Sequence, residues 1–208
     1  MYFCKQILTY FIMKRQSTDI RQEQIKQAVI DIISNEGIKN LSIKNLAERI
    51  GMSEGSIFRH FKSKNDIIVS IFNYIQYNFI GELGKIARSY EYPSIRLNKY
   101  LSSTIEYHTE NKGINMLLFS EASYKNNPEL KKRLKQIFHD QKQFVMEIIS
   151  DGIRAETWDE NIVVENVALM YMGIPLAMNM EMLIGGKGFQ FDNFCSQMIL
   201  LLLKMLKK

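Results

Sequence analysis

Apolar residues recur every three or four positions along most of the chain, the spacing that places them on one face of an α-helix. In the first third this pattern predicts four helices: one over residues 17–35, a short one at 43–50, a second short one after Ser53, and one that begins at Ser63. A glycine follows each of the first two, where a helix C-cap is expected. Serine is a favoured N-cap for the other two.

Beyond residue 80, two glycines and Tyr92-Pro93 predict a break over residues 81–93. Asp159 is expected to cap a later helix and Pro175 to kink one. Since no segment alternates with the period of a β-strand, the sequence predicts an all-α fold, with a three-helix helix-turn-helix head followed by a helical C-terminal domain. The helices of that domain are expected near residues 94–111, 114–123, 128–154, 160–184 and 190–207.

The chain is expected to have three parts: a tail or upstream extension over residues 1–16, a head over 17–78 and a body over 79–208. The apolar start of the tail lacks the basic residues and the cleavage site of a signal peptide, and it is too short to span a bilayer. The apolar run at residues 199–203 is also too short and predicts a buried or interfacial helix.

Positive charge is concentrated in the head. Residues 1–70 contain 11 Lys and Arg against 7 Asp and Glu, whereas the rest of the chain contains 16 against 15. Such an excess is expected if this third of the chain binds a polyanion, although ordinary surface charge would also fit.

Cys4 and Cys195 are too far apart for a disulfide framework or a metal cluster, and they favour a reduced, cytoplasmic setting. His60, His108 and His139 are scattered without metal-ligand spacing. Neither a nucleophile–base pair nor a phosphate-binding glycine loop is evident. The sequence therefore predicts no catalytic residue, no metal and no cofactor.

Residues 41–64 predict two short helices joined by a tight, glycine-containing turn, which is the layout of a DNA-reading helix-turn-helix. On a helical wheel Ile57 and Phe61 share a face suited to packing, and Gly55 and Arg59 point the other way. A glycine lets the backbone approach a groove closely, and an arginine can bond a guanine edge. The residues expected to contact DNA are Ser42, Ser53, Gly55, Ser56, Phe58, Arg59, His60, Lys62 and Lys64.

Several short motifs follow one another without gaps over residues 21–72. They are Arg21 and Ala28, Gly37, Ser42-Ile43 with Leu46-Ala47, Gly51-Met52-Ser53, Gly55-Ser56-Ile57-Phe58, Phe61 and Ser63-Lys64. This series, about a quarter of the chain, resembles the DNA-binding head of TetR-family regulators.

The resemblance implies a symmetric dimer, usually a repressor, that leaves DNA when a small molecule enters the C-terminal domain. Phe58 departs from the family pattern, which commonly has a tyrosine there whose hydroxyl meets a phosphate. Phenylalanine cannot form that bond, so we expect a shifted set of contacts and retained binding.

The body has more soft and aromatic side chains than packing requires, including five methionines in the helix predicted at 160–184. We therefore predict a pocket for a small apolar or aromatic effector. The residues expected to line it are Met116, Phe119, Tyr124, Phe138, Met170, Tyr171 and Met178.

The last two predicted helices are apolar over a wider arc than the single stripe that a monomer buries. They are expected to form the four-helix interface of a two-fold homodimer, although a body of this size could also bury both helices within one chain. The residues expected at the interface are Val163, Val167, Phe194, Met198, Leu201, Leu202 and Met205.

Together these features favour a ligand-responsive, DNA-binding transcriptional regulator, most readily a repressor released from a palindromic operator by its effector. One alternative keeps the DNA-binding dimer and gives its body a protein partner or no effector. A more distant alternative is a helical enzyme or lipid carrier with a coincidental helical hairpin.

Overall fold

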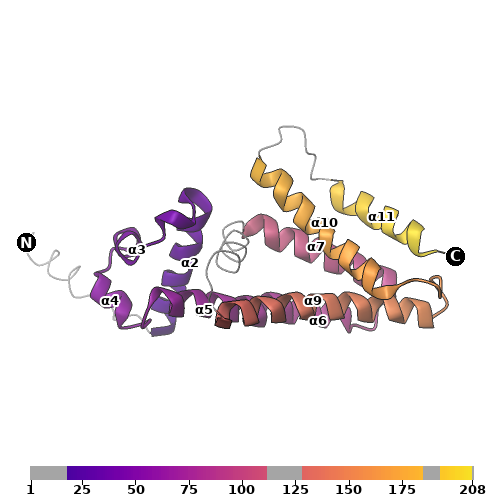
Figure 1. Cartoon of the computed structure of the whole chain (residues 1–208), viewed down its shortest axis with the longest axis horizontal. Helices are drawn as coiled ribbons and strands as arrows, with labels where there is room; N and C mark the ends of the chain where they lie inside the picture. The colour runs from indigo at the N-terminus through magenta and orange to yellow at the C-terminus, as the bar shows by residue number, and fades with distance from the viewer. Residues whose placement is uncertain (1–17, 112–127, 185–192, 208) are drawn as a thin grey trace, which may run out of the picture. The chain divides into compact units, whose positions relative to one another are not determined.

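A computed structural model describes residues 18–111, 128–184 and 193–207 (Figure 1). Every element in these ranges is helical, which confirms the all-α prediction. The chain divides into two compact units, one ending at Ile71 and one beginning at Phe72. The domain limits expected from the sequence, 17–78 and 79–208, stay predictions.

The first unit has a small apolar core built from all of its helices. Ile57 and Phe61 are 0% and 5% exposed, which confirms their predicted inward face. Ile25 of the first helix and Leu46 of the next are equally buried. The elements are α2 (Thr18–Glu36), the 3₁₀ turn η1 (Ile38–Asn40), α3 (Ile43–Ile50), α4 (Glu54–Phe58) and the start of α5 (Lys64–Tyr74).

The turn between α3 and α4 is fixed by its backbone and its caps. Gly51 ends α3 with a φ of 63°, in the left-handed region where any side chain would be strained. Its N–H donates to the carbonyl groups of Ala47 and Glu48 in α3. Ser42 and Ser53 each accept a hydrogen bond from the backbone N–H three residues later, at 3.1 and 3.2 Å. The predicted turn and the Ser53 cap are therefore confirmed.

The second unit is organised around α7, which packs against α6, α9, α10 and α11. α10 also packs along α9, so these helices enclose a common core. The elements are the π-helical stretch η2 (Ile75–Ile80), α6 (Gly81–Ala87), α7 (Pro93–Glu110), α9 (Pro128–Arg154), α10 (Val164–Ile184) and α11 (Phe194–Leu206).

The break predicted over residues 81–93 is wrong in its first half. α5, η2 and α6 follow one another without interruption as far as Ala87, and Gly81 has a helical φ of −59°. Gly84 lies against the ring of Phe144, where a Cβ atom would be 3.0 Å from the nearest ring atom. This glycine therefore allows α6 to approach α9 closely and does not end the helix.

Two helix starts also differ from the prediction. α10 begins at Val164 and not at residue 160, because the Asp159 carboxylate accepts the N–H of Asn161 at 2.9 Å and closes a separate turn. α11 begins at Phe194, and α10 continues through Pro175. The helix predicted at 114–123 lies outside the described residues.

Arg96 ties the turn between α6 and α7 to the end of α9. Its buried guanidinium donates to the Ala87 carbonyl at 2.6 Å and to the Asp151 carboxylate at 2.8 Å. Partial burial acts to raise the pKa of Asp151, but hydrogen bonds from Arg96 and Arg154 outweigh it and hold this pKa below its ordinary value.

We expect the Asp151→Asn variant to lose about 2 kcal/mol of unfolding free energy at neutral pH, the contribution of a hydrogen-bonded charge pair. Since the folded-state pKa is depressed, this stability is present above the unfolded pKa and is lost as pH falls below about 4. Denaturant unfolding at pH 7 and at pH 3 measures it. A difference between the two proteins that stays constant with pH would contradict this role, and exposed Glu110→Gln is the control.

Candidate DNA interface and effector pocket

Three polar side chains predicted to contact DNA lie together on the exposed side of α4. The hydroxyl oxygens of Ser53 and Ser56 are 2.9 Å apart. The guanidinium of Arg59 donates to the Ser56 hydroxyl at 2.7 Å. Since Arg59 is exposed, its remaining N–H donors can reach a phosphate or a base edge without any change of fold.

The surface beside these side chains is open. A Cβ atom built at Gly55 would meet nothing within 4 Å. Phe58 is 48% exposed, so its ring is available to a sugar or a thymine methyl group. The sequence placed Gly55 on the outward face of the second short helix and Phe58 on its flank, and both residues are exposed in the structure.

Two backbone N–H groups at the start of α5 are bonded within the chain. The backbone N–H of Lys62 donates to the Asp66 carboxylate at 3.0 Å. The N–H of Asp66 donates to the Ser63 hydroxyl at 3.1 Å, as expected for a serine N-cap. These two N–H groups are therefore satisfied within the chain, whereas the side chains of Lys62 and Ser42 are exposed.

Lys64 and His60 have contacts inside the head. The Lys64 ammonium donates to the carbonyl of Leu41 at 2.6 Å and so braces α5 against the segment before α3. The His60 ring is half-buried, and its carbonyl accepts a hydrogen bond from the side chain of Gln22 at 3.1 Å. Both residues support the fold of the head, and a DNA contact for them stays a prediction.

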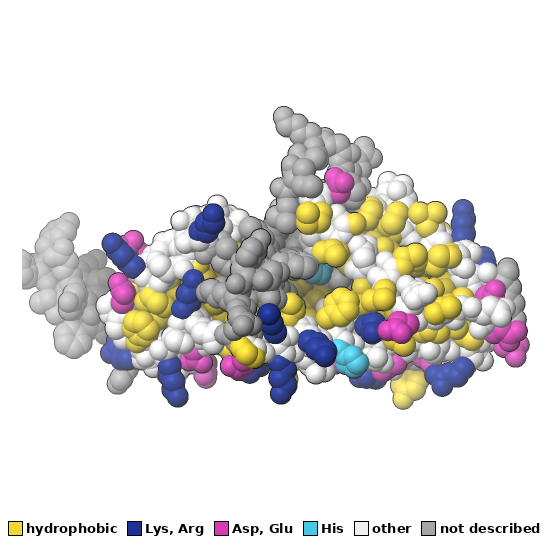
Figure 2. Space-filling model, viewed as in Figure 1, with side chains coloured by type: hydrophobic (Ala, Val, Ile, Leu, Met, Phe, Trp, Pro, Cys, Tyr) yellow, Lys and Arg dark blue, Asp and Glu magenta, His cyan; other side chains and the backbone are white. Residues whose placement is uncertain are grey.

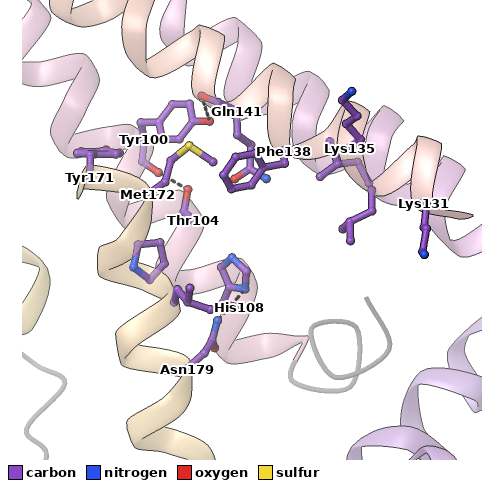
Figure 3. Close-up of a pocket in the computed structure, with 14 residues that line it drawn as sticks. Tyr100, Thr104, His108, Lys131, Lys135, Phe138, Gln141, Tyr171, Met172 and Asn179 are labelled. Carbon is purple, nitrogen blue, oxygen red and sulfur yellow. Dashed lines mark hydrogen bonds between the residues drawn. The ribbon is translucent and has the colours of Figure 1, made fainter. Parts of the chain in front are cut away.

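The second unit contains a cavity of about 490 Å³ between α7, α9 and α10 (Figure 3). This size is within the range of small-molecule sites. Its walls are mostly apolar and aromatic. The lining residues are Tyr100, Thr104 and His108 from α7; Lys131, Leu134, Lys135, Ile137, Phe138 and Gln141 from α9; and Tyr171, Met172, Pro175, Leu176 and Asn179 from α10.

Of the predicted pocket residues, Phe138 and Tyr171 line this cavity. Met170 is 47% exposed and Met178 is fully buried, and neither is part of the lining. Met172 lines the cavity in place of Met170, because two residues along a helix rotate the side chain by about 200°. Met116, Phe119 and Tyr124 lie outside the described residues.

Sequence reasoning missed the α7 wall of the cavity. Tyr100, Thr104 and His108 are four residues apart, which places them on one helical face. That spacing was visible in the sequence, but helical spacing of this kind more often marks a packed core than a cavity.

The two tyrosines of the cavity direct their hydroxyl groups to the backbone. Tyr171 donates to the Leu97 carbonyl at 2.5 Å, and Tyr100 donates to the Gln141 carbonyl at 3.4 Å. Burial raises the pKa of both phenols well above the ordinary value, so both rings are neutral. Their contribution to the cavity is therefore an apolar, aromatic surface.

The apolar surface of α10 and α11 is only partly buried within the chain. Val163, Leu201 and Met205 are 61%, 59% and 47% exposed. Figure 2 shows hydrophobic side chains gathered over these two helices. Other exposed members of this surface are Leu169, Met170, Leu176, Met180 and Leu200.

The other predicted interface residues are less exposed. Val167, Phe194 and Met198 are half-buried. Leu202 is only 3% exposed, so it packs inside its own chain, and its prediction as an interface residue is corrected. The reason is geometric: Leu202 lies about 100° from Leu201 around α11, on the side of the helix that packs within the chain.

Within the described ranges, no helix is both long and apolar enough to cross a membrane. The same ranges contain no group of three or more His, Cys, Asp or Glu side chains arranged to hold a metal ion.

A capped helix-turn-helix with an exposed Ser-Ser-Arg surface, followed by an all-helical unit with a cavity, defines a helix-turn-helix DNA-binding protein. Residues 27–71 match the family described as bacterial regulatory proteins, tetR family. The helix-turn-helix head therefore matches this family, as its motifs suggested.

Relatives extend the likeness beyond the head. Nucleoid occlusion factor SlmA from Haemophilus ducreyi is 27% identical over 127 residues, which is 61% of this chain and 63% of that protein. The chain thus spans less than two thirds of the length of this relative.

Solved structures share the fold over most of the chain. The regulator FadR from Bacillus subtilis, in complex with stearoyl-CoA, has a TM-score of 0.68 and 18% identity, covering 88% of this chain and 96% of that one. The TetR-family regulator PfmR from Thermus thermophilus has a TM-score of 0.75 and 16% identity, covering 88% and 99%.

Proposed function

We propose that this chain is a ligand-responsive transcriptional regulator that binds DNA as a homodimer. The observation that carries the proposal is the exposed Ser53–Ser56–Arg59 chain of hydrogen bonds beside Gly55, on a helix-turn-helix of the TetR family. Repression is the proposed action, because a regulator of this kind occupies its operator until an effector binds.

Dimerisation is supported by the exposed apolar surface of α10 and α11. A group of apolar side chains that is exposed to water in the single chain marks a protein–protein interface. In a two-fold dimer the two helices of each chain would form a four-helix interface. Two heads at a fixed spacing would then read a palindromic operator whose half-sites are roughly one helical turn or a little more apart.

The cavity supports control by an apolar effector. It is lined by three helices of the second unit, and its walls are dominated by apolar and aromatic side chains. FadR from Bacillus subtilis, which shares the fold, has been crystallised with stearoyl-CoA, an apolar chain on a polar carrier. An effector releases DNA only if it binds more tightly to the arrangement of the heads that does not fit the operator.

The test is binding to DNA from upstream of the chain's own gene, measured by fluorescence anisotropy at several salt concentrations. We expect a steep salt dependence, because exposed cations of the head displace counterions from DNA. Absence of binding at low salt would overturn the proposal and favour a lipid carrier.

Replacing Arg59 by alanine is expected to weaken operator binding by roughly 1–3 kcal/mol and to change the preference among operator variants. The reason is that an outward arginine can form two hydrogen bonds to one guanine. Arg88→Ala, in the second unit, is the matched control and should bind as the wild type does. Equal weakening on every operator variant would show that Arg59 contacts phosphate only.

A second candidate function follows from the SlmA match, which extends well past the head to 61% of the chain. Here the DNA-bound dimer would mark many chromosomal sites, and its body would bind a protein partner. Chromatin immunoprecipitation separates the two: a few sites upstream of genes support the regulator, whereas many sites spread over the chromosome support the second candidate.

A further inference from the structure

The effector cavity is apolar at one end and polar at the other. Tyr100 and Tyr171 meet edge to face, with ring centroids 6.0 Å apart, and present no free hydroxyl. His108 and Asn179, further along α7 and α10, are hydrogen-bonded to each other at 3.1 Å. Eight residues of helix separate Tyr100 from His108, so the two ends are about 12 Å apart.

Two lysines of α9 line the cavity away from the tyrosines (Figure 3). Lys131 and Lys135 are exposed and form no ion pair within the described residues. Other cations of α9 do form such pairs: Lys142 bonds Glu165 at 2.7 Å, and Arg133 bonds Glu129 at 3.0 Å.

Among the described residues that line this cavity there is no aspartate or glutamate. In Figure 3 the side chains of Lys131 and Lys135 point in different directions. Both are exposed, so each can turn toward an anion bound at this end of the cavity and form a charge-assisted contact with it.

We propose that the effector is an anionic amphiphile whose acidic head group binds Lys131 and Lys135 and whose hydrocarbon chain extends toward Tyr100 and Tyr171. This inference rests on the proposed function and assigns the chemical class of its ligand. A free carboxylic acid and a coenzyme A thioester would both supply the required anion, the first as carboxylate and the second as phosphate. An aliphatic alcohol or amine would not.

The test is isothermal titration calorimetry on the full chain with decanoate, decanoyl-CoA and decan-1-ol, each below its solubility limit or micelle concentration. We expect at least one of the two anions to bind about tenfold or more tightly than the alcohol, which corresponds to about 1.4 kcal/mol. The tighter of the two anions identifies the source of the head group. Equal affinities for the alcohol and both anions would overturn the proposal.

The double variant Lys131→Ala/Lys135→Ala should lose at least tenfold in affinity for the anion and retain its affinity for the alcohol. Both side chains are exposed, so the fold should be kept, and the melting temperature checks this. Lys132→Ala removes the same charge from an exposed neighbour outside the cavity lining and is the matched control. A loss of affinity no larger than that of Lys132→Ala would also overturn the proposal.

Operator binding without amphiphile separates this inference from the proposed function. A double variant that binds the operator like the wild type but no longer binds the anion supports both. A wild-type chain that binds the anion and never binds DNA supports the head-group assignment and contradicts the regulator.

Discussion

Replacing Gly55 by leucine is expected to lower operator affinity about 100-fold or more, which corresponds to about 2.7 kcal/mol. Within the chain the new side chain meets no obstacle, since a Cβ atom at this position has nothing within 4 Å. Replacing a glycine inside a helix should even raise the free energy of unfolding by about 0.5 kcal/mol. The loss of affinity would thus come from a steric clash between the leucine side chain and the wall of the DNA groove. Operator titration and chemical denaturation measure the two effects.

Gly81→Leu is the matched control for this experiment. Gly81 is an exposed helical glycine of α6, where a Cβ atom would have only one neighbour, at 3.9 Å. That variant should gain stability in the same way and keep its operator affinity. A Gly55→Leu protein that binds the operator normally would show that α4 does not approach the groove at this residue.

Replacing Leu201 by glutamate is expected to convert the proposed dimer to a monomer at micromolar concentration. Leu201 is 59% exposed on α11, so its replacement leaves the core of the single chain intact. In the dimer, however, two carboxylates would be buried in an apolar interface, and each would cost several kcal/mol in lost hydration. A monomer has only one DNA-binding head, so operator binding should also weaken about 100-fold or more. In a dimer, binding of the first head holds the second head at high effective concentration near its half-site. Analytical ultracentrifugation and operator titration measure both changes.

Ile95→Glu is the control for Leu201→Glu, because Ile95 is an aliphatic residue of similar exposure, 41%, on α7. It should remain a dimer. Leu202→Glu should instead unfold the chain, since Leu202 is 3% exposed. A wild-type protein that sediments as a monomer would contradict the interface directly, and so would a Leu201→Glu dimer.

Local features of the head followed from the sequence because their causes are local. The Ser53 hydroxyl accepts a hydrogen bond from an N–H group only three residues further along the chain. The conformation of Gly51 depends on the turn alone. The inward direction of Ile57 and the outward direction of Gly55 follow from helical periodicity within one short segment. The sequence alone therefore determined the all-helical fold, the helix-turn-helix and the side of α4 that faces outward.

Features that join distant segments were decided by the tertiary structure. Gly84 lies inside α6 and does not end it. The ring of Phe144, on α9, occupies the space beside Gly84 that a side chain would fill. The Lys64 ammonium bonds the backbone of Leu41, and Leu202 is buried against its own chain. Residues of α7, α9 and α10 meet around one cavity, and no local pattern indicates which face of each helix will line it. Periodicity gives the direction of a side chain relative to its own helix, but only packing decides what lies in that direction.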